Sequence, residues 1–146
     1  LKGNTQLKSE NSTAVARKNK KISEICSIMR TLCHELKPFV FLSVLPQLVS
    51  RICHQNKVVW EVLSSILVKT FSSFPDQVCW QMIGIAHSTF TQRVKRCKSI
   101  FDAISTQNSS CGYLINSMSV FNSYILELCN IKSRGDHILL SQEFSN

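Results

Sequence analysis

The strongest constraint on the fold is the spacing of the apolar residues, which recur at steps of three and four from residue 22 onward. Such steps place side chains on one face of an α-helix. No strand-like alternation of apolar and polar residues competes with it, although the Val and Ile content of residues 58–68 favours a strand locally. The pattern predicts an all-α protein. Its first helical stripe consists of Ile22, Ile25, Ile28 or Met29, Leu32 and Leu36.

Proline and polar residues divide this pattern into about six helices. Pro38 and Pro75 suit the first position of a helix, where the missing N–H costs little. Pro46 lies inside the second helix and is expected to kink or split it. Short connections imply antiparallel neighbours, so we expect stacked helical hairpins, an α-solenoid, with a compact bundle as the alternative. The expected helices lie around residues 22–36, 38–53, 58–71, 75–86, 94–104 and 114–129, with residues 105–110 as a polar break.

Charge and polarity suggest three parts in this chain of 146 residues. The net charge is +8, and residues 1–37 supply +5 of it, from eight Lys and Arg against three Asp and Glu. Residues 1–21 are polar and basic and are expected to form a flexible lead-in. Residues 22–131 form the predicted helical-repeat segment, and residues 132–146 form a polar tail. Because the chain begins with Leu1 and not Met, we expect it to be a piece of a longer protein.

The cysteines are predicted to be free thiols that pack as small apolar side chains in a reducing compartment. No two have the C-x-x-C spacing of a zinc site, and their number is odd. The two Cys-His dipeptides point their side chains in different directions on a helix. We therefore expect no structural zinc. The seven cysteines are Cys26, Cys33, Cys53, Cys79, Cys97, Cys111 and Cys129.

Sequence patterns for catalysis are missing. The four glycines are isolated from one another, so no phosphate-binding loop is predicted. None of the three aspartates has a carboxylate or histidine partner at helical spacing. We expect no catalytic residue, cofactor or metal in this chain. We also expect no membrane span, because the longest apolar stretch, residues 38–49, is short and interrupted.

Four cations form a basic cluster on the fifth predicted helix. Arg93, Lys95, Arg96 and Lys98 spread over more than half of the helix circumference, which is typical of a solvated face or a charged protein interface. Nucleic-acid modules usually add aromatic residues for stacking, and none interleaves here. The cluster is therefore a candidate interaction surface, and a free-standing nucleic-acid-binding module remains the alternative.

The largest apolar side chains are the expected packing anchors, either for contacts with neighbouring repeats or, as we favour for most of them, for the core of this segment. Burial of one such aromatic residue contributes on the order of 2 kcal/mol, so Trp80→Ala is predicted to destabilise the fold by several kcal/mol. The expected anchors are Phe39, Leu42, Leu48, Ile52, Trp60, Leu67, Phe71, Trp80 and Phe101.

Several blocks of sequence resemble the late FAT region of phosphatidylinositol-kinase-related protein kinases, and the ATR-type checkpoint kinases in particular. Together they extend over about residues 30–132, in the family's order. Two departures, Pro46 and the segment Ala86-His87-Ser88, leave the TOR branch as the alternative. The blocks are Pro38-Phe39-Val40-Phe41-Leu42, residues 45–54 (LPQLVSRICH), residues 74–80 (FPDQVCW), residues 93–100 (RVKRCKSI) and residues 126–130 (LELCN).

The resemblance implies a non-catalytic helical scaffold from a nuclear Ser/Thr protein kinase of DNA-damage and replication checkpoint signalling. The parent would phosphorylate Ser-Gln and Thr-Gln sites with ATP and magnesium, and its catalytic residues would lie beyond residues 132–146. The segment would pack against the kinase domain and neighbouring helical repeats. An ATR-partner subunit is also implied, with DNA contacted only indirectly. Thr91, Thr106 and Ser141, each followed by Gln, are candidate phosphorylation sites.

Overall fold

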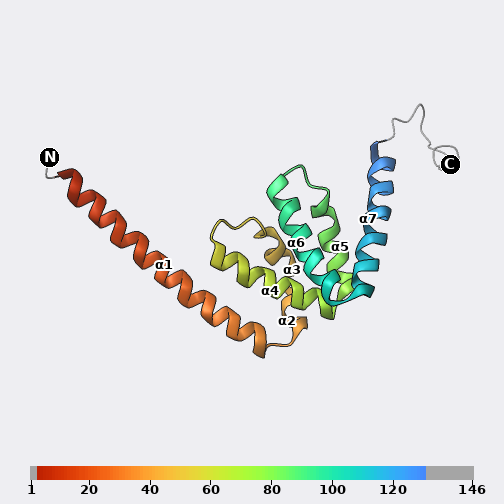
Figure 1. Ribbon diagram of the computed structural model, residues 1–146, viewed down its shortest axis with the longest axis horizontal. Helices are drawn as coiled ribbons and strands as arrows, with labels where there is room; N and C mark the ends of the chain where they lie inside the picture. Colours follow the sequence, from red (N-terminus) through yellow and green to blue (C-terminus); the bar gives the residue numbers. More distant parts are fainter. Residues whose placement is uncertain (1–2, 131–146) are drawn as a thin grey trace.

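The computed structural model describes the backbone of residues 3–130 and the side chains of residues 13–130, and this part of the chain is built from helices and short turns (Figure 1). The prediction of an all-α, helical-repeat fold is confirmed. The helices are α1 (Gly3–Glu35), α2 (Pro38–Ser43), α3 (Leu45–Ser50), α4 (Lys57–Ser73), α5 (Pro75–Ala86), α6 (Thr91–Gln107) and α7 (Ser109–Asn130).

Helix α4 lies at the centre of the fold. It contacts α1, α2 and α3 as well as α5 and α6, and α7 packs on α5 and α6. Most consecutive helices are therefore also neighbours in space, which is what short connections in a helical-repeat fold require. Helix α1 extends away from the body, so that its first residues and the end of α7 lie at opposite ends of the molecule (Figure 1).

Two apolar clusters meet at α4. The main cluster consists of buried side chains from α3 through α7. It includes Phe71, whose ring meets that of Phe101 edge-on at 6.0 Å between centroids. The smaller cluster joins α1 and α2 to α4 through side chains such as Cys26 and Ile66. Helix α4 thus holds the long first helix against the rest of the fold. Among the residues of the main cluster that lie fully out of solvent are Leu45, Ile52, Leu67, Phe71, Met82, Ile100 and Ile104.

The helix starts follow the expected chemistry. Pro38 and Pro75 stand at the beginning of α2 and α5. Asn56 caps α4, since its side-chain oxygen accepts hydrogen bonds from the N–H groups of Val58 at 2.9 Å and Val59 at 3.2 Å. The break predicted over residues 105–110 is reduced to Asn108, because exposed polar residues are compatible with a helix and only Asn108 has an extended backbone between α6 and α7.

Pro46 splits the second predicted helix, as one of the two expected outcomes. Helix α2 ends at Ser43, and α3 begins at Leu45. Val44 between them leaves the helical region, with φ −109° and ψ 11°. Proline has no N–H for the bond to the residue four positions earlier, and its ring clashes with that carbonyl. The split turns one predicted helix into two and gives seven elements in residues 3–130.

Helix α1 begins at Gly3, well before the predicted start at Ile22. The expected helix start at Ile22 is therefore wrong, and the polar lead-in is helical from Gly3 onward. The segment lacks apolar spacing because residues 13–21 are all exposed and need no buried face. It has no proline and several Lys, Arg, Gln and Ala residues, which favour the helix by intrinsic preference.

The predicted anchors divide into three groups. Ile52, Leu67, Phe71 and Phe101 are buried. Phe39 and Trp80 are exposed, so the prediction that Trp80 lies in the core is wrong, whereas Phe39 matches the alternative of an anchor on the surface. Trp80 is 63% exposed because α5 turns Cys79, Met82 and Ile83 toward the core, which puts Trp80 on the outer side. The partly buried anchors are Leu42, Leu48 and Trp60.

Most of the cysteines pack as small apolar side chains, as predicted. All seven are free thiols, five of them buried, with Cys53 half-buried and Cys129 exposed. Burial raises the pKa of the Cys97 thiol to about 12, with the neighbouring Cys79 adding to the shift. Burial first, and then Asp76 and Cys111, raise the pKa of Cys79 to about 11. Both thiols therefore stay protonated and weakly nucleophilic at neutral pH.

Candidate interaction surfaces

The most connected side chain of the predicted basic cluster is Arg96, and it turns into the fold. Its Nη1 donates hydrogen bonds to the carbonyl oxygens of Ile52 at 2.7 Å and His54 at 2.8 Å. Its guanidinium also stacks on the ring of Trp60, 4.4 Å from the ring centroid. These carbonyls follow the end of α3, where backbone oxygens lack helical partners. Arg96 thus fastens the α3–α4 turn to α6.

This contact brings together two blocks that are separate in the sequence. Residues 45–54 supply the two carbonyl acceptors, and residues 93–100 supply the arginine. Between them in sequence lies Trp60, whose ring has the guanidinium of Arg96 over it. Two of the five blocks that carry the family resemblance are therefore parts of one structural joint.

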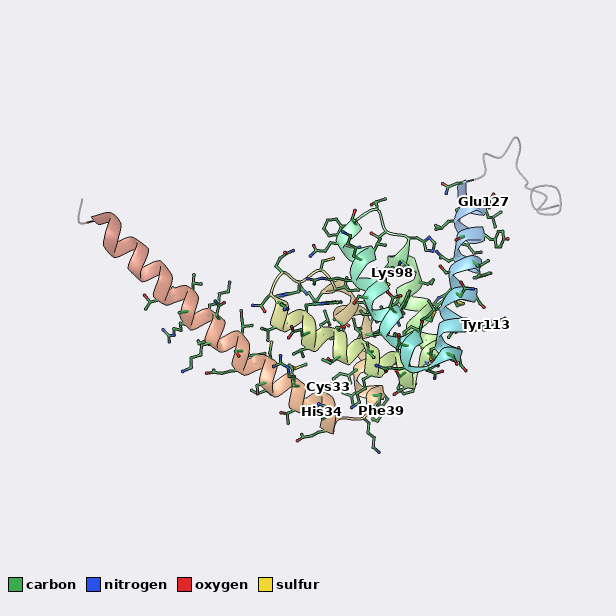
Figure 2. The ribbon with its side chains drawn as sticks, viewed as in Figure 1. Cys33, His34, Phe39, Lys98, Tyr113 and Glu127 are labelled. Atoms are coloured by element: carbon green, nitrogen blue, oxygen red, sulfur yellow. The ribbon has the colours of Figure 1, made fainter. Side chains whose placement is uncertain are left out.

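The other three cations of the cluster, Arg93, Lys95 and Lys98, are exposed on α6. Figure 2 labels Lys98 on this helix. With Arg96 engaged in the fold, the four residues do not act as one surface. The three exposed cations fit a solvated face or a charged protein interface better than a nucleic-acid site, which would need a continuous basic surface.

Lys69 was not selected from the sequence, yet it joins α4 to the end of α1. Its Nζ donates hydrogen bonds to the carbonyl oxygen of Cys33 and, at 3.0 Å, to that of Leu36. A cation at a helix C-terminus satisfies unpaired carbonyls and interacts well with the helix dipole. The available signal was one lysine among the apolar residues of α4, a position where a charge needs a partner.

We expect Lys69→Met to lower the free energy of unfolding by about 1–2 kcal/mol, because two hydrogen bonds from a charged donor are lost while the apolar stem is kept. The loss should appear as faster amide hydrogen exchange in the last turn of α1. Lys98→Met is the matched control, since Lys98 is exposed on α6. Equal effects of the two substitutions on chemical denaturation would contradict the capping role of Lys69.

An apolar edge runs along α5 and α7. Trp80 lies beside Phe121, with ring centroids 6.4 Å apart and both side chains exposed. Further exposed residues continue along α7, and Figure 2 shows Tyr113 directed away from the body. We call this surface the α7 edge; it comprises Trp80, Tyr113, Val120, Phe121, Tyr124 and Ile125. A run of exposed large apolar side chains of this kind is typical of a protein interface.

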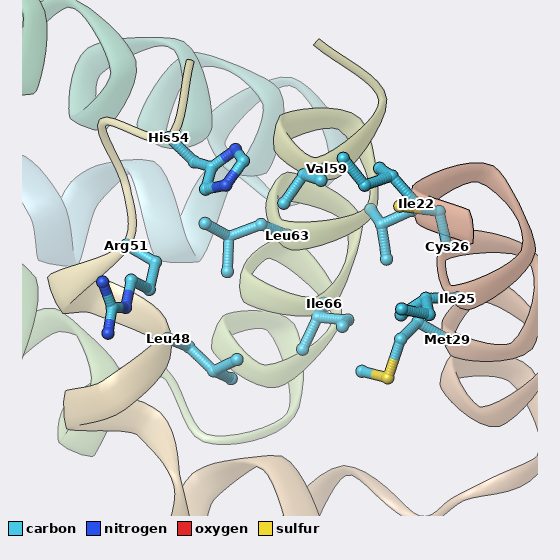
Figure 3. Close-up of a pocket in the computed structure, with 11 residues that line it drawn as sticks. Ile22, Ile25, Cys26, Met29, Leu48, Arg51, His54, Val59, Leu63 and Ile66 are labelled. Carbon is cyan, nitrogen blue, oxygen red and sulfur yellow. The ribbon is translucent and has the colours of Figure 1, made fainter. Parts of the chain in front are cut away.

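A second apolar surface is a groove of about 450 Å³ between α1 and the α3–α4 part of the body (Figure 3). Helix α4 forms its floor with residues such as Leu63 and Ile66, and α1 forms one side with Ile25 and Met29. On the opposite side, Arg51 and His54 belong to the turn after α3. The rest of the lining is apolar, so this surface, here called the α1 groove, suits an apolar side-chain stripe.

Of the candidate phosphorylation sites, Thr91 is the first residue of α6 and Thr106 lies in its last turn, both exposed. The Thr106 hydroxyl donates a hydrogen bond to the carbonyl of Asp102 at 2.8 Å. Ser141 and the polar tail of residues 132–146 lie outside the described residues. Phosphorylation at these sites stays a prediction.

Neither a metal site nor a membrane span is found in the described part of the chain. No three His, Cys, Asp or Glu side chains of these residues come close enough together to hold a metal ion. None of the helices between residues 3 and 130 is both long and apolar enough to cross a membrane.

The fold defines a helical-repeat segment with exposed apolar and basic side chains on its surface. The chain belongs to the family described as serine/threonine-protein kinase ATR-like, HEAT repeats, whose model matches residues 24–121. The match contains both halves of the Arg96 joint. The chain is therefore a segment of the ATR type, as the sequence blocks indicated.

Individual relatives are similar over most of this chain and a small part of their own length. The serine/threonine-protein kinase ATR of Oryza sativa subsp. indica is 30% identical over 139 residues, 88% of this chain and 5% of the relative. Protein kinase rad3 of Schizosaccharomyces pombe is 26% identical over 133 residues, which are 87% of this chain and 6% of the relative. The serine/threonine-protein kinase ATR of Drosophila melanogaster is 27% identical over 109 residues, which are 75% of this chain and 4% of the relative.

Proposed function

We propose that the chain is a non-catalytic scaffold segment of a nuclear, ATR-like Ser/Thr protein kinase. In this proposal the parent acts in DNA-damage and replication checkpoint signalling. It phosphorylates Ser-Gln and Thr-Gln sites with ATP and magnesium. The observation that carries the proposal is the family match across residues 24–121, which includes the structural joint at Arg96.

The segment could belong to one of two helical regions of the parent, the HEAT repeats or the FAT region. The resemblance implied the FAT region, whereas the matching family is described by its HEAT repeats. We therefore propose a place among the HEAT repeats, with the FAT region as the alternative. The relatives named above are an ATR kinase of rice, an ATR kinase of fly and rad3 of fission yeast, which favours the ATR branch over the TOR branch.

The mechanical role of the segment is to pack against its neighbours in the parent. Repeats of this kind bury their apolar faces against the next repeat, since each contacts only its neighbours. The α7 edge is the surface that supports this proposal, because Trp80 and Phe121 would be costly to leave in water. Further contacts proposed for this segment are the kinase domain of the same parent and, as the resemblance implies, an ATR-partner subunit.

The test is to recover the endogenous protein with an antibody raised against this chain. We expect a polypeptide many times larger than the 16.6 kDa of the chain, because the relatives exceed it in length to that degree. The recovered protein should phosphorylate a Ser-Gln peptide in the presence of ATP and magnesium. A Ser-Ala peptide of the same sequence is the control.

Two further measurements sharpen this experiment. Peptide mass spectrometry of the recovered protein gives the distance between this segment and the kinase domain, which distinguishes HEAT repeats from the FAT region. Immunofluorescence should place the protein in the nucleus. The kinase activity of the recovered protein toward the Ser-Gln peptide should rise after replication stress. Recovery of a free 16.6 kDa protein without kinase activity would show that the proposal is wrong.

A further inference from the structure

We propose that the α1 groove is a docking site for an amphipathic helix with an acidic flank, supplied by a separate partner protein. This site is independent of the α7 edge, since it lies on the other side of α4 in the cluster formed with α1. The proposal rests on the shape of the groove, on its apolar lining and on the charges around it.

The shape and lining fit one helix. The groove is open to solvent between α1 and the turn after α3, with α4 as its floor (Figure 3). Ile25 is 60% exposed at its side, so an apolar residue of the groove still faces water. A helix with apolar residues at i, i+3, i+4 and i+7 presents a stripe that fills such a groove.

The charges around the groove select an acidic occupant. Arg51 is the cation on one side of it. Along α1, an adjoining hollow shares Ile22 and Ile25 with the groove and adds Arg17, Lys18 and Lys21. Neither lining includes an Asp or Glu among the residues that the structure describes. Complementary charges steer a partner to the surface and suppress wrong partners, so acidic residues should flank the apolar stripe.

The same charges argue against two other occupants. A neighbouring repeat of the same parent would have to bury the basic run of α1, and burial of unpaired charges is costly. A second copy of this chain carries the same net charge of +8 and would bring like charges together. A separate acidic helix avoids both costs, because its carboxylates pair with the basic side chains at the solvent-exposed rim.

The probe is a fluorescent, amphipathic helical peptide of about 18 residues with a leucine stripe and flanking glutamates, titrated with the full 146-residue chain. We expect saturable binding that weakens as salt is raised, because the charges at the rim are exposed. The same peptide with lysines in place of the glutamates should bind at least about tenfold more weakly.

Matched variants locate the site. Ile25 and Ile28 are both 60% exposed on α1, and only Ile25 lines the groove. Ile25→Asp should therefore weaken peptide binding at least about tenfold, whereas Ile28→Asp should leave it unchanged. For the charges, the pair Lys18→Glu and Lys21→Glu should weaken binding, and Lys20→Glu, which lies outside both linings, is the control. Circular dichroism confirms that each variant is folded.

Several results would overturn the proposal. These are no saturable binding, equal affinity for the acidic and basic peptides, or equal loss in Ile25→Asp and Ile28→Asp. Sedimentation that shows a dimer abolished by Ile25→Asp would assign the groove to a second copy. Loss of peptide binding when the chain is extended by the preceding residues of the parent would assign it to a neighbouring repeat. Because only the last result needs the parent, failure here is distinguishable from failure of the proposed function.

Discussion

Replacement of Phe71 by Ala should lower the free energy of unfolding by about 3–5 kcal/mol, the largest effect expected in this chain. Phe71 is fully buried in α4 and touches Phe101 edge-on, so its removal leaves a cavity in the main cluster. Domains of this size are stable by only about 5–15 kcal/mol, so much of the stability would be lost. Chemical denaturation monitored by circular dichroism measures the change.

Trp80→Ala is the control for Phe71→Ala. The tryptophan is the larger side chain, but 63% of it is exposed and its aromatic contact is with Phe121, which is also exposed. We expect a loss of less than about 1 kcal/mol. This small loss replaces the destabilisation by several kcal/mol that the sequence predicted for Trp80→Ala, because that prediction placed Trp80 in the core. A larger loss for Trp80→Ala than for Phe71→Ala would contradict the assignment of the core.

Replacement of Arg96 by Ala should lower the free energy of unfolding by about 2–3 kcal/mol. Two hydrogen bonds from a charged donor to the carbonyls of Ile52 and His54 are lost, together with the stacking on Trp60. The carbonyl of Ile52 then lacks a partner in a part-buried site. Denaturation gives the total, and hydrogen exchange should show faster opening of the turn between α3 and α4.

Arg93→Ala is the matched control, because Arg93 is an exposed arginine one turn earlier on α6. Its substitution should change the free energy of unfolding by less than about 0.5 kcal/mol. A double-mutant cycle of Arg96→Ala with Trp60→Leu isolates the cation–π part of the joint, expected to be about 0.5–1 kcal/mol. Equal effects of Arg93→Ala and Arg96→Ala would remove Arg96 from its structural role.

Much of the helical architecture was predictable because helix formation is largely local. Steps of three and four between apolar residues, and proline at positions 38, 46 and 75, predicted the elements and the split between α2 and α3. Local rules were less reliable where apolar spacing was missing. The start of α1 was placed at Ile22 because an exposed helix leaves no such spacing.

The surfaces were harder to predict because they depend on how helices face one another. The four cations within residues 93–98 of α6 look alike in the sequence, and only the position of Ile52 and His54 distinguishes Arg96 from its exposed neighbours. The role of Lys69 depends on the end of α1, more than thirty residues earlier in the chain. The α1 groove exists only because α1 and the turn after α3 lie on either side of α4.

The all-α class, the approximate helices, the free cysteines and the resemblance to ATR-type kinases were all predictable from the amino-acid sequence, because periodicity, proline geometry and motif order are properties of the chain. The three-dimensional packing was needed to tell which aromatic side chain is core and which is surface, which arginine forms a structural joint, and where the α1 groove and the α7 edge lie. The physical reason is that burial and hydrogen-bond partners depend on helix rotation and packing across long sequence separations, as the contrast between Phe71 and Trp80 shows.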